Sequence, residues 1–302
     1  MLGMSKKVDH YVTQLDDTPW LTVLGYAWGA FSMIVLMVLV APAAWRPTVK
    51  MAGLALPLLF FMAKDLAQIP RVLVAMHNLR GQRAGVLRYV LTCLPPALIG
   101  AARLDRALWG NFLKWARRQP TPLRPAGIRL SYDERGAYPT VVALGLFSML
   151  VELPIGGAIL PLLIANSSAT KAIHLLSALS AAYSLVWLLG DRWSVRHGYH
   201  VLTDSHLDLH IGARAKAYIP LAAIEDISPL HESMDEWRGK RSLRHAETVN
   251  ITPFDKPNLV VRLSPRADCM INHHGLDRNG TRYVFLYLDH PGQLVSAFAS
   301  KL

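Results

Sequence analysis

The sequence predicts a helical membrane domain followed by an α+β domain, and two observations carry that prediction. Hydrophobic residues make up 52% of the chain and charged residues only 18%, which is more apolar than is usual for a soluble protein. Residues 191–302 hold 14 Lys+Arg and 13 Asp+Glu, which leaves 18 and 8 for residues 1–190. The basic excess therefore accompanies the apolar stretches, where membrane topology and anionic lipids explain it better than nucleic acid does.

Four apolar stretches are expected to form transmembrane helices. Each is long enough to cross about 30 Å of hydrocarbon at about 1.5 Å per residue. They are residues 20–44, 51–76, 140–165 and 172–190. Residues 86–101 contain Arg88 and the pair Pro95-Pro96, so we expect them to lie in the interface, although a fifth or sixth crossing stays open.

The loop at residues 77–138 orients these helices. Residues 103–135 carry eight Lys+Arg and three Asp+Glu, and such basic loops stay on the cytoplasmic side. With four spans, the N-terminal segment 1–19 and residues 191–302 lie on that side too. We therefore expect a multi-pass transmembrane domain over residues 20–190 and a cytoplasmic domain over residues 191–302.

A helix with aromatic residues between cations is expected inside this loop. Leu104, Leu108, Phe112 and Trp115 recur at helical spacing. Two interpretations stay open: an amphipathic helix lying among lipid headgroups, or a helix packed on the inner ends of the spans. The candidate contacts to headgroups or to a partner are Arg103, Arg106, Trp109, Lys114, Trp115, Arg117 and Arg118.

A polar layer inside the membrane is the second candidate site. Glu152 lies 14 residues before Asn166, and Lys64 lies 14 residues after Lys50, so both are expected about 21 Å from the outer end of their spans. The predicted layer comprises Lys64, Asp65, Glu152 and Tyr183. An intramembrane carboxylate is by default a functional candidate. The alternative is a structural salt bridge or a protonated Glu that fixes helix packing, which the usual pairing of buried charges favours.

From Tyr199 onward the apolar residues alternate with polar ones, which is typical of strands. The expected strands are residues 199–203, 206–211, 217–221, 258–263 and 281–288. Asp289 is expected to cap a final helix, with Pro291 in its first turn. Residues 232–250 are charged and are expected to form a solvated segment, and a lipid-facing patch of Arg238, Lys240, Arg241 and Arg244 is the alternative. The result is an α+β domain of antiparallel strands closed by a C-terminal helix.

One strand presents a weak candidate for metal binding. His206, Asp208 and His210 share one face, because alternate residues of a strand do, and they are metal-ligand types. A third ligand from elsewhere is needed, so a solvated strand face is the favoured interpretation. The two cysteines, Cys93 and Cys269, have no metal-binding spacing. No metal or other cofactor is therefore expected.

The cytoplasmic domain resembles a known family in two stretches. The opening YHVLTDSHLDLHIGARAKAYIPLAAIEDI (199–227) resembles the first strands of bacterial pleckstrin-homology-like (PH-like) domains. The closing VFLYLDHPGQLVSAFASKL (284–302) is similar to the last strand and capping helix of such domains. The chain also looks like bacterial multi-pass membrane proteins in which such a domain follows the spans, with Glu152-Leu153-Pro154 in a late span and Leu188-Leu189-Gly190-Asp191 as the junction. The resemblance implies a PH-like domain on the cytoplasmic face of a bacterial inner membrane.

The sequence favours binding over catalysis. It contains no phosphate loop, dinucleotide fingerprint, nucleophile elbow or zinc motif. We expect the cytoplasmic domain (191–302) to fold alone and to bind membrane lipid headgroups or a protein partner, with no role for nucleic acid. The alternative is a small membrane enzyme or transporter built on the polar layer around Glu152. Self-association as a homo-oligomer stays open.

Overall fold

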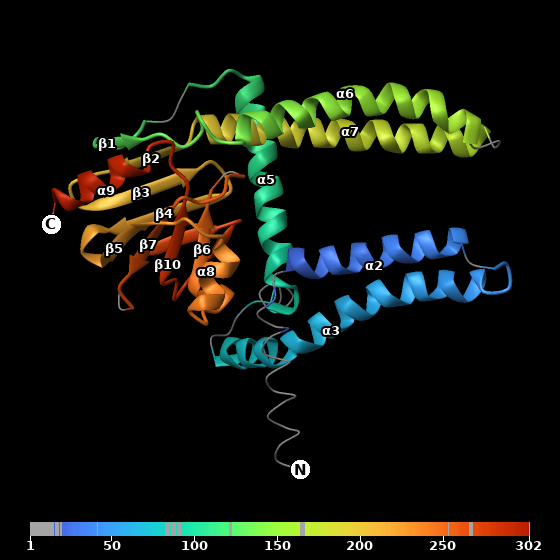
Figure 1. Ribbon diagram of the computed structural model, residues 1–302, viewed down its shortest axis with the longest axis horizontal. Coiled ribbons are helices and arrows are strands. Elements are labelled where there is room, and N and C mark those ends of the chain that lie inside the picture. The colour runs from blue at the N-terminus through green and yellow to red at the C-terminus, as the bar shows by residue number, and fades with distance from the viewer. Residues whose placement is uncertain are drawn as a thin grey trace, which may run out of the picture. The chain divides into compact units, whose positions relative to one another are not determined.

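The computed structural model describes residues 15, 18, 20–40, 42–81, 85, 89, 92–120, 123–163, 167–252, 254–265 and 268–301 (Figure 1). The chain forms two compact units, Met1–Ile99 and Gly100–Leu302. The second unit therefore holds helices as well as the predicted cytoplasmic domain.

The first unit contains a pair of long apolar helices. They are α2 (Trp20–Val40) and α3 (Arg46–Gly81), which pack side by side along their length (Figure 1). Val23, Ala27 and Ala67 are buried, whereas many larger apolar side chains such as Trp28 and Leu66 are exposed. An apolar exterior of this kind suits a lipid environment better than water.

The second unit contains a similar helical pair, α6 (Tyr138–Leu163) and α7 (Ser167–Arg196), and the helix α5 (Pro96–Ala116). Exposed apolar side chains such as Leu150 and Leu176 also cover this pair. Helices thus cover most of the described part of each predicted span. By length and composition alone, the described stretches Arg46–Arg80 and Ser167–Arg196 suffice to cross a membrane, and Thr22–Val38 and Tyr138–Val151 are shorter apolar stretches. A count of four crossings stays a prediction.

Two sheets form the rest of the second unit. The strands of the first are β1 (Ile128–Leu130), β2 (Tyr199–Leu202), β3 (His206–Ile211), β4 (Ala215–Pro220), β8 (Met270–His273) and β9 (Leu276–Asp277), antiparallel in that order. The second has the order β5 (Ile224–Pro229), β7 (Leu259–Leu263), β10 (Tyr283–Leu286) and β6 (Thr248–Ile251). The prediction of antiparallel strands is wrong for one pair, because β6 and β10 run parallel. A connection between distant segments, rather than a hairpin, brings that pair together.

The apolar core is built from the alternating residues of these strands. In β3, Leu207, Leu209 and Ile211 are fully buried, and they pack with Val261 of β7 and Val284 of β10. The helix α9 (Pro291–Ala299) adds further core residues, Leu294 and Phe298. The predicted C-terminal helix is therefore present and closes the domain.

The segment before α6 is part of the same core. The strand β1, from the predicted loop 77–138, pairs with β2, so the sheet extends beyond the predicted domain 191–302. Tyr132 and Tyr138 are each 3% exposed within the core. These contacts join the sheets to the start of α6.

Asp289 does not cap α9, whose N-cap residue is His290. Its carboxylate accepts hydrogen bonds from the Ser131 hydroxyl and from the backbone N–H groups of Glu134 and Arg135, at 3.1 and 2.9 Å for the two backbone bonds. These bonds offset burial and hold the pKa of Asp289 below its usual range. The prediction was wrong because a tertiary loop, rather than the adjacent helix, supplies the donors.

Candidate functional site

A hollow of about 710 Å³ lies between α5, the end of α7 and two turns of the first sheet. We call it the basic cleft. Its cations are Arg103, Arg106 and Lys114 of α5 and Lys216 of β4. Its other polar side chains are Asn111, Ser194, His197, His210 and Asn272, and Trp193 supplies an aromatic wall. Sequence reasoning identified the three cations of α5 as candidate contacts.

Close backbone packing fixes α5 against α7. Leu108 is fully buried, and a Cβ added at Gly190 would lie 2.2 Å from the Leu108 carbonyl oxygen. Only glycine therefore fits at this crossing. The Asn111 side-chain amide donates to the Ser194 hydroxyl at 3.0 Å, and the Tyr183 hydroxyl donates to the Asp105 carboxylate at 2.5 Å. These bonds set the helical wall of the cleft.

The opposite wall is made by two tight turns. Arg103 donates from Nη1 to the Gly275 carbonyl oxygen at 2.8 Å, which joins α5 to the turn between β8 and β9. Gly275 has φ +74°, and a Cβ there would lie 2.8 Å from the Arg103 Cβ. Gly212, in the turn between β3 and β4, has φ +51° and lies against Ser194. Glycine is needed at both positions for this approach.

The lining carries a net positive charge. Among the described residues, no Asp or Glu lines the cleft. None of its four cations forms an ion pair within the part of the chain that the structure describes. Lys114 lies over the Trp193 ring, 5.4 Å from its centroid. A cleft lined by one sign of charge focuses its field and attracts anions.

His210 adds little to this charge at neutral pH. Burial, and secondly the nearby Lys216 charge, lowers the pKa of His210 to about 4. His210 Nδ1 is buried without a hydrogen-bond partner among the described groups. The His197 ring stacks on Trp193 with 4.2 Å between ring centroids. The positive potential therefore comes from arginine and lysine.

The structure gathers most of the predicted headgroup contacts near this site. Trp115 and Arg118 line a neighbouring hollow of about 670 Å³ that shares Trp193 and His197 with the basic cleft. Arg117 is exposed just beyond α5, and the Trp109 ring lies beside the Tyr183 ring, with 6.2 Å between centroids. These two do not line either hollow.

Sequence reasoning missed Trp193 and Lys216. A tryptophan three residues beyond an apolar span fits the aromatic belt at a membrane surface, so a signal for Trp193 was present. Lys216 is one exposed residue of an alternating strand. Its place in the cleft depends on its pairing with His210, which no local pattern reveals.

The members of the predicted polar layer belong to different units: Lys64 and Asp65 to the first, Glu152 and Tyr183 to the second. The described members contact groups outside the predicted layer or are exposed. Lys64 is 1% exposed and donates to the Leu15 carbonyl oxygen at 2.7 Å, and Asp65 is exposed. The Tyr183 hydroxyl donates a hydrogen bond to Asp105. The Glu152 side chain lies outside the described residues. The layer as a whole stays a prediction.

The weak metal candidate does not form a cluster. His206, Asp208 and His210 alternate on β3 and are each partly buried. The His206 ring nitrogen contacts the Thr203 and Ser205 hydroxyls at 3.0 and 2.9 Å. Across the described residues, no three His, Cys, Asp or Glu side chains come together as a metal site requires.

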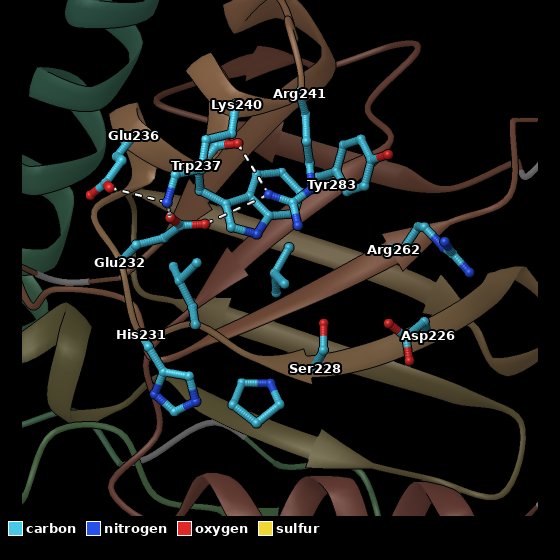
Figure 2. Close-up of a pocket in the computed structure, with 13 residues that line it drawn as sticks. Asp226, Ser228, His231, Glu232, Glu236, Trp237, Lys240, Arg241, Arg262 and Tyr283 are labelled. Atoms are coloured by element: carbon cyan, nitrogen blue, oxygen red, sulfur yellow. Dashed lines mark hydrogen bonds and ion pairs between the residues drawn. The ribbon is translucent and has the colours of Figure 1, made fainter.

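A third hollow, of about 560 Å³, lies on the outer face of the second sheet beside α8 (Met234–Lys240) (Figure 2). Trp237 of α8 is 7% exposed and packs edge-on against Phe285, so this predicted solvated segment covers the sheet with one apolar side. Lys240 pairs with Glu232 and Glu236, and Arg241 with Glu232 (Figure 2). Acids and bases neutralise each other here, unlike in the basic cleft.

The basic cleft can hold a small anion through arginine forks, a lysine and neutral donors. Guanidinium groups bind phosphate in a bidentate manner, and such charge-assisted bonds are about twice as strong as neutral ones. No protein-family model, curated protein or solved structure matches this chain.

Proposed function

We propose that this protein is an integral inner-membrane protein that binds anionic phospholipid headgroups at the cytoplasmic surface, without catalysis. The basic cleft receives the headgroup phosphate. The observation that carries the proposal is the lining of the cleft, which holds the four cations Arg103, Arg106, Lys114 and Lys216 and no carboxylate among the described lining residues.

The place of the cleft along the chain supports a lipid ligand. Trp193 and Ser194 follow the predicted span 172–190 by three and four residues, about 5 Å of helix, which is the depth of the headgroup region. Within the second unit, α5 runs across the end of α7 rather than along it (Figure 1). The exposed Trp109 and Leu113, four residues apart, give α5 an apolar side suited to the interface.

The energetic scale is adequate for such binding. Each Lys or Arg near an anionic membrane surface contributes about 1 kcal/mol. Four of them in one cleft therefore give a preference that measurement can resolve. Two packed sheets with a C-terminal helix support the PH-like interpretation, and four spans with both termini in the cytoplasm complete the proposed topology. A PH-like fold hosts many binding functions, so the cleft rather than the fold carries the proposal.

Lipid retention by the full chain tests the proposal. The protein is reconstituted in nanodiscs of phosphatidylcholine with a minor fraction of anionic phospholipid, and bound lipids are counted by native mass spectrometry. We expect the wild type to enrich the anionic fraction over its bulk share. The double variant Arg106→Gln/Lys216→Gln is expected to lose that enrichment, because both side chains line the cleft.

A matched control removes two cations from the other hollow. Lys240→Gln/Arg262→Gln changes the net charge equally but alters only the hollow beside α8. It is expected to retain anionic lipid as the wild type does. Equal retention by the cleft variant and the wild type, with both folded by thermal melting, would sink the proposal.

A further inference from the structure

Four cations line the basic cleft. Their total positive charge exceeds the single negative charge of an ordinary anionic headgroup. The phosphodiester of a simple anionic phospholipid carries a single negative charge, whereas a phosphomonoester carries about −1.5 to −2 near neutral pH and offers three terminal oxygens. Arg103, Arg106, Lys114 and Lys216 come from α5 and β4, on opposite walls. A group with three free oxygens can meet cations on both walls at once.

The backbone around the cleft leaves room for a compact group. Ala107 and Gly110 lie on the α5 wall, and nothing lies within 4 Å of a Cβ built on Gly110. A terminal phosphate is linked to its lipid through one oxygen, so its three other oxygens can face this open part of the wall. A phosphodiester carries substituents on two of its oxygens and presents only two free oxygens to the same wall.

One of the cations is held in place before a ligand binds. Arg103 donates from Nη1 to the Gly275 carbonyl oxygen at 2.8 Å, which orients the guanidinium and leaves its other N–H donors for an anion. Ser194 is oriented in the same way, because its hydroxyl oxygen accepts from the Asn111 amide at 3.0 Å and keeps its own proton to donate. Groups that are already oriented lose less conformational freedom when a ligand binds.

From these contacts we infer that the basic cleft selects a terminal phosphate, a phosphomonoester group of a membrane lipid, over a phosphodiester headgroup. This inference rests on the proposed function and names its ligand class. Arg103, Arg106 and Lys216 hold the phosphate oxygens, and Lys114 completes the charge balance.

Competition between two anionic lipids tests the selectivity. The full chain is placed in phosphatidylcholine nanodiscs that contain both phosphatidic acid and phosphatidylglycerol, at matched total charge of the two. Phosphatidic acid is a phosphomonoester, and phosphatidylglycerol is a phosphodiester. We expect the wild type to retain phosphatidic acid at least tenfold over phosphatidylglycerol. Arg106→Gln/Lys216→Gln should bring that ratio to about one, and Lys240→Gln/Arg262→Gln should leave it unchanged.

The outcomes separate this inference from the proposed function. Equal enrichment of both anionic lipids over phosphatidylcholine overturns the selectivity and leaves lipid binding standing. No enrichment of either overturns the proposed function as well. Glycerol 3-phosphate in solution is the third arm: if it displaces phosphatidic acid at equal concentration, a soluble phosphomonoester is the ligand and the membrane source is overturned.

Gly275→Ala tests the positioning of Arg103 separately. The added Cβ meets the Arg103 Cβ at 2.8 Å and the Gly100 carbonyl oxygen at 3.3 Å, and φ is +74°, so the variant moves the turn away from α5 and disturbs the Arg103 hydrogen bond without removing a charge. We expect the ratio of phosphatidic acid to phosphatidylglycerol to fall at least threefold while total anionic enrichment persists. Gly280→Ala also carries a positive φ, of +77°, but has open space around it, and it controls for backbone strain alone.

Discussion

Arg214, in the turn between β3 and β4, forms a two-pronged ion pair with Asp191 near the end of α7. Its Nε lies 2.7 Å from Oδ1 and its Nη2 lies 2.8 Å from Oδ2. The Tyr138 hydroxyl donates to the same carboxylate at 3.0 Å, and the Arg214 guanidinium lies over the Phe254 ring at 4.1 Å. The start of α6, the end of α7 and the sheets therefore meet at one carboxylate. Because Gly212 and Ala213 of this turn line the basic cleft, the pair also fixes one wall of the proposed site.

Replacing Asp191 with Asn is expected to destabilise the second unit. The Asp191 side chain is 1% exposed and that of Arg214 is 12% exposed, so the change removes a buried negative charge that lies 2.7 Å from a largely buried guanidinium. Removing one partner of a buried pair costs about 3–5 kcal/mol. Thermal unfolding of the full chain in detergent, followed by tryptophan fluorescence, measures the loss.

An exposed ion pair provides the control for this change. Arg262 and Glu225 pair at 3.0 Å with side chains 51% and 40% exposed, so Glu225→Gln should cost at most about 1 kcal/mol. Similar thermal unfolding midpoints for the Asp191 and Glu225 variants would show that the buried pair contributes no more to stability than a surface pair does.

Gly190→Ala is expected to separate α5 from α7. The new Cβ meets backbone atoms of Leu108 and Phe112 at 2.2 and 3.2 Å, and backbone cannot move aside as a flexible side chain can. Overpacking of this kind costs about 1–3 kcal/mol, or about 2–10 °C of midpoint in a unit of this size. Retention of anionic lipid should fall as well, because α5 carries three of the four cleft cations.

Gly239→Ala is the matched control for that prediction. Gly239 lies in α8 with nothing within 4 Å of an added Cβ, so the helix should gain up to about 1 kcal/mol from alanine. A fall in midpoint for both variants would point to a general intolerance of substitution rather than to the crossing.

Mild acid is expected to destabilise the sheets. The pKa values of His200 and His273 are lowered to about 3, and that of His210 to about 4. Burial is the main cause for all three. In the unfolded chain these three histidines bind protons near pH 6.5, whereas in the folded chain they do not. Stability is therefore full above pH 6.5 and falls as the pH drops toward 4. At pH 5.5 the penalty is about 1 kcal/mol for each such histidine.

Comparison of two histidine variants isolates this effect. His200→Gln removes a group that is 1% exposed, so its midpoint should change less between pH 7.5 and 5.5 than that of the wild type. His290→Gln changes an exposed residue at the start of α9 and should keep the wild-type pH dependence. If the midpoint of the His200 variant changed with pH as much as that of the wild type, His200 would not be a source of the acid sensitivity.

Local patterns predicted much of this fold. The apolar runs identified α2, α3, α6 and α7, and the alternation of Leu207, Leu209 and Ile211 identified β3 and its buried face. Apolar residues at helical spacing identified α5, and the cations between them include three residues of the candidate site. These features depend on residues that are neighbours in the sequence, so periodicity reveals them.

Features that depend on distant partners escaped prediction. The strand β1 has only three residues, and its register with β2 (Ile128 opposite Leu202) joins segments separated by the two helices α6 and α7. Asp289 stands directly before a helix, which is the local pattern of a cap, yet its donors lie more than 150 residues away. Lys216 enters the cleft through sheet pairing alone. Burial and tertiary hydrogen bonds decide these positions, and neither is local in the sequence.

The position of β1 gives the last prediction, which concerns isolated fragments. Residues 191–302 alone lack β1, which is one of the two strands that pair with β2, the buried Tyr132 and Tyr138, and the N–H groups that bind Asp289. We expect this fragment to lack cooperative thermal unfolding. Adding residues 123–138 through a short Gly/Ser linker should restore it, and the junction is feasible because the Tyr138 hydroxyl lies 3.0 Å from the Asp191 carboxylate. If residues 191–302 alone unfold as sharply as the linked chain, then β1 and its loop contribute little, and the boundary at residue 191 holds for folding.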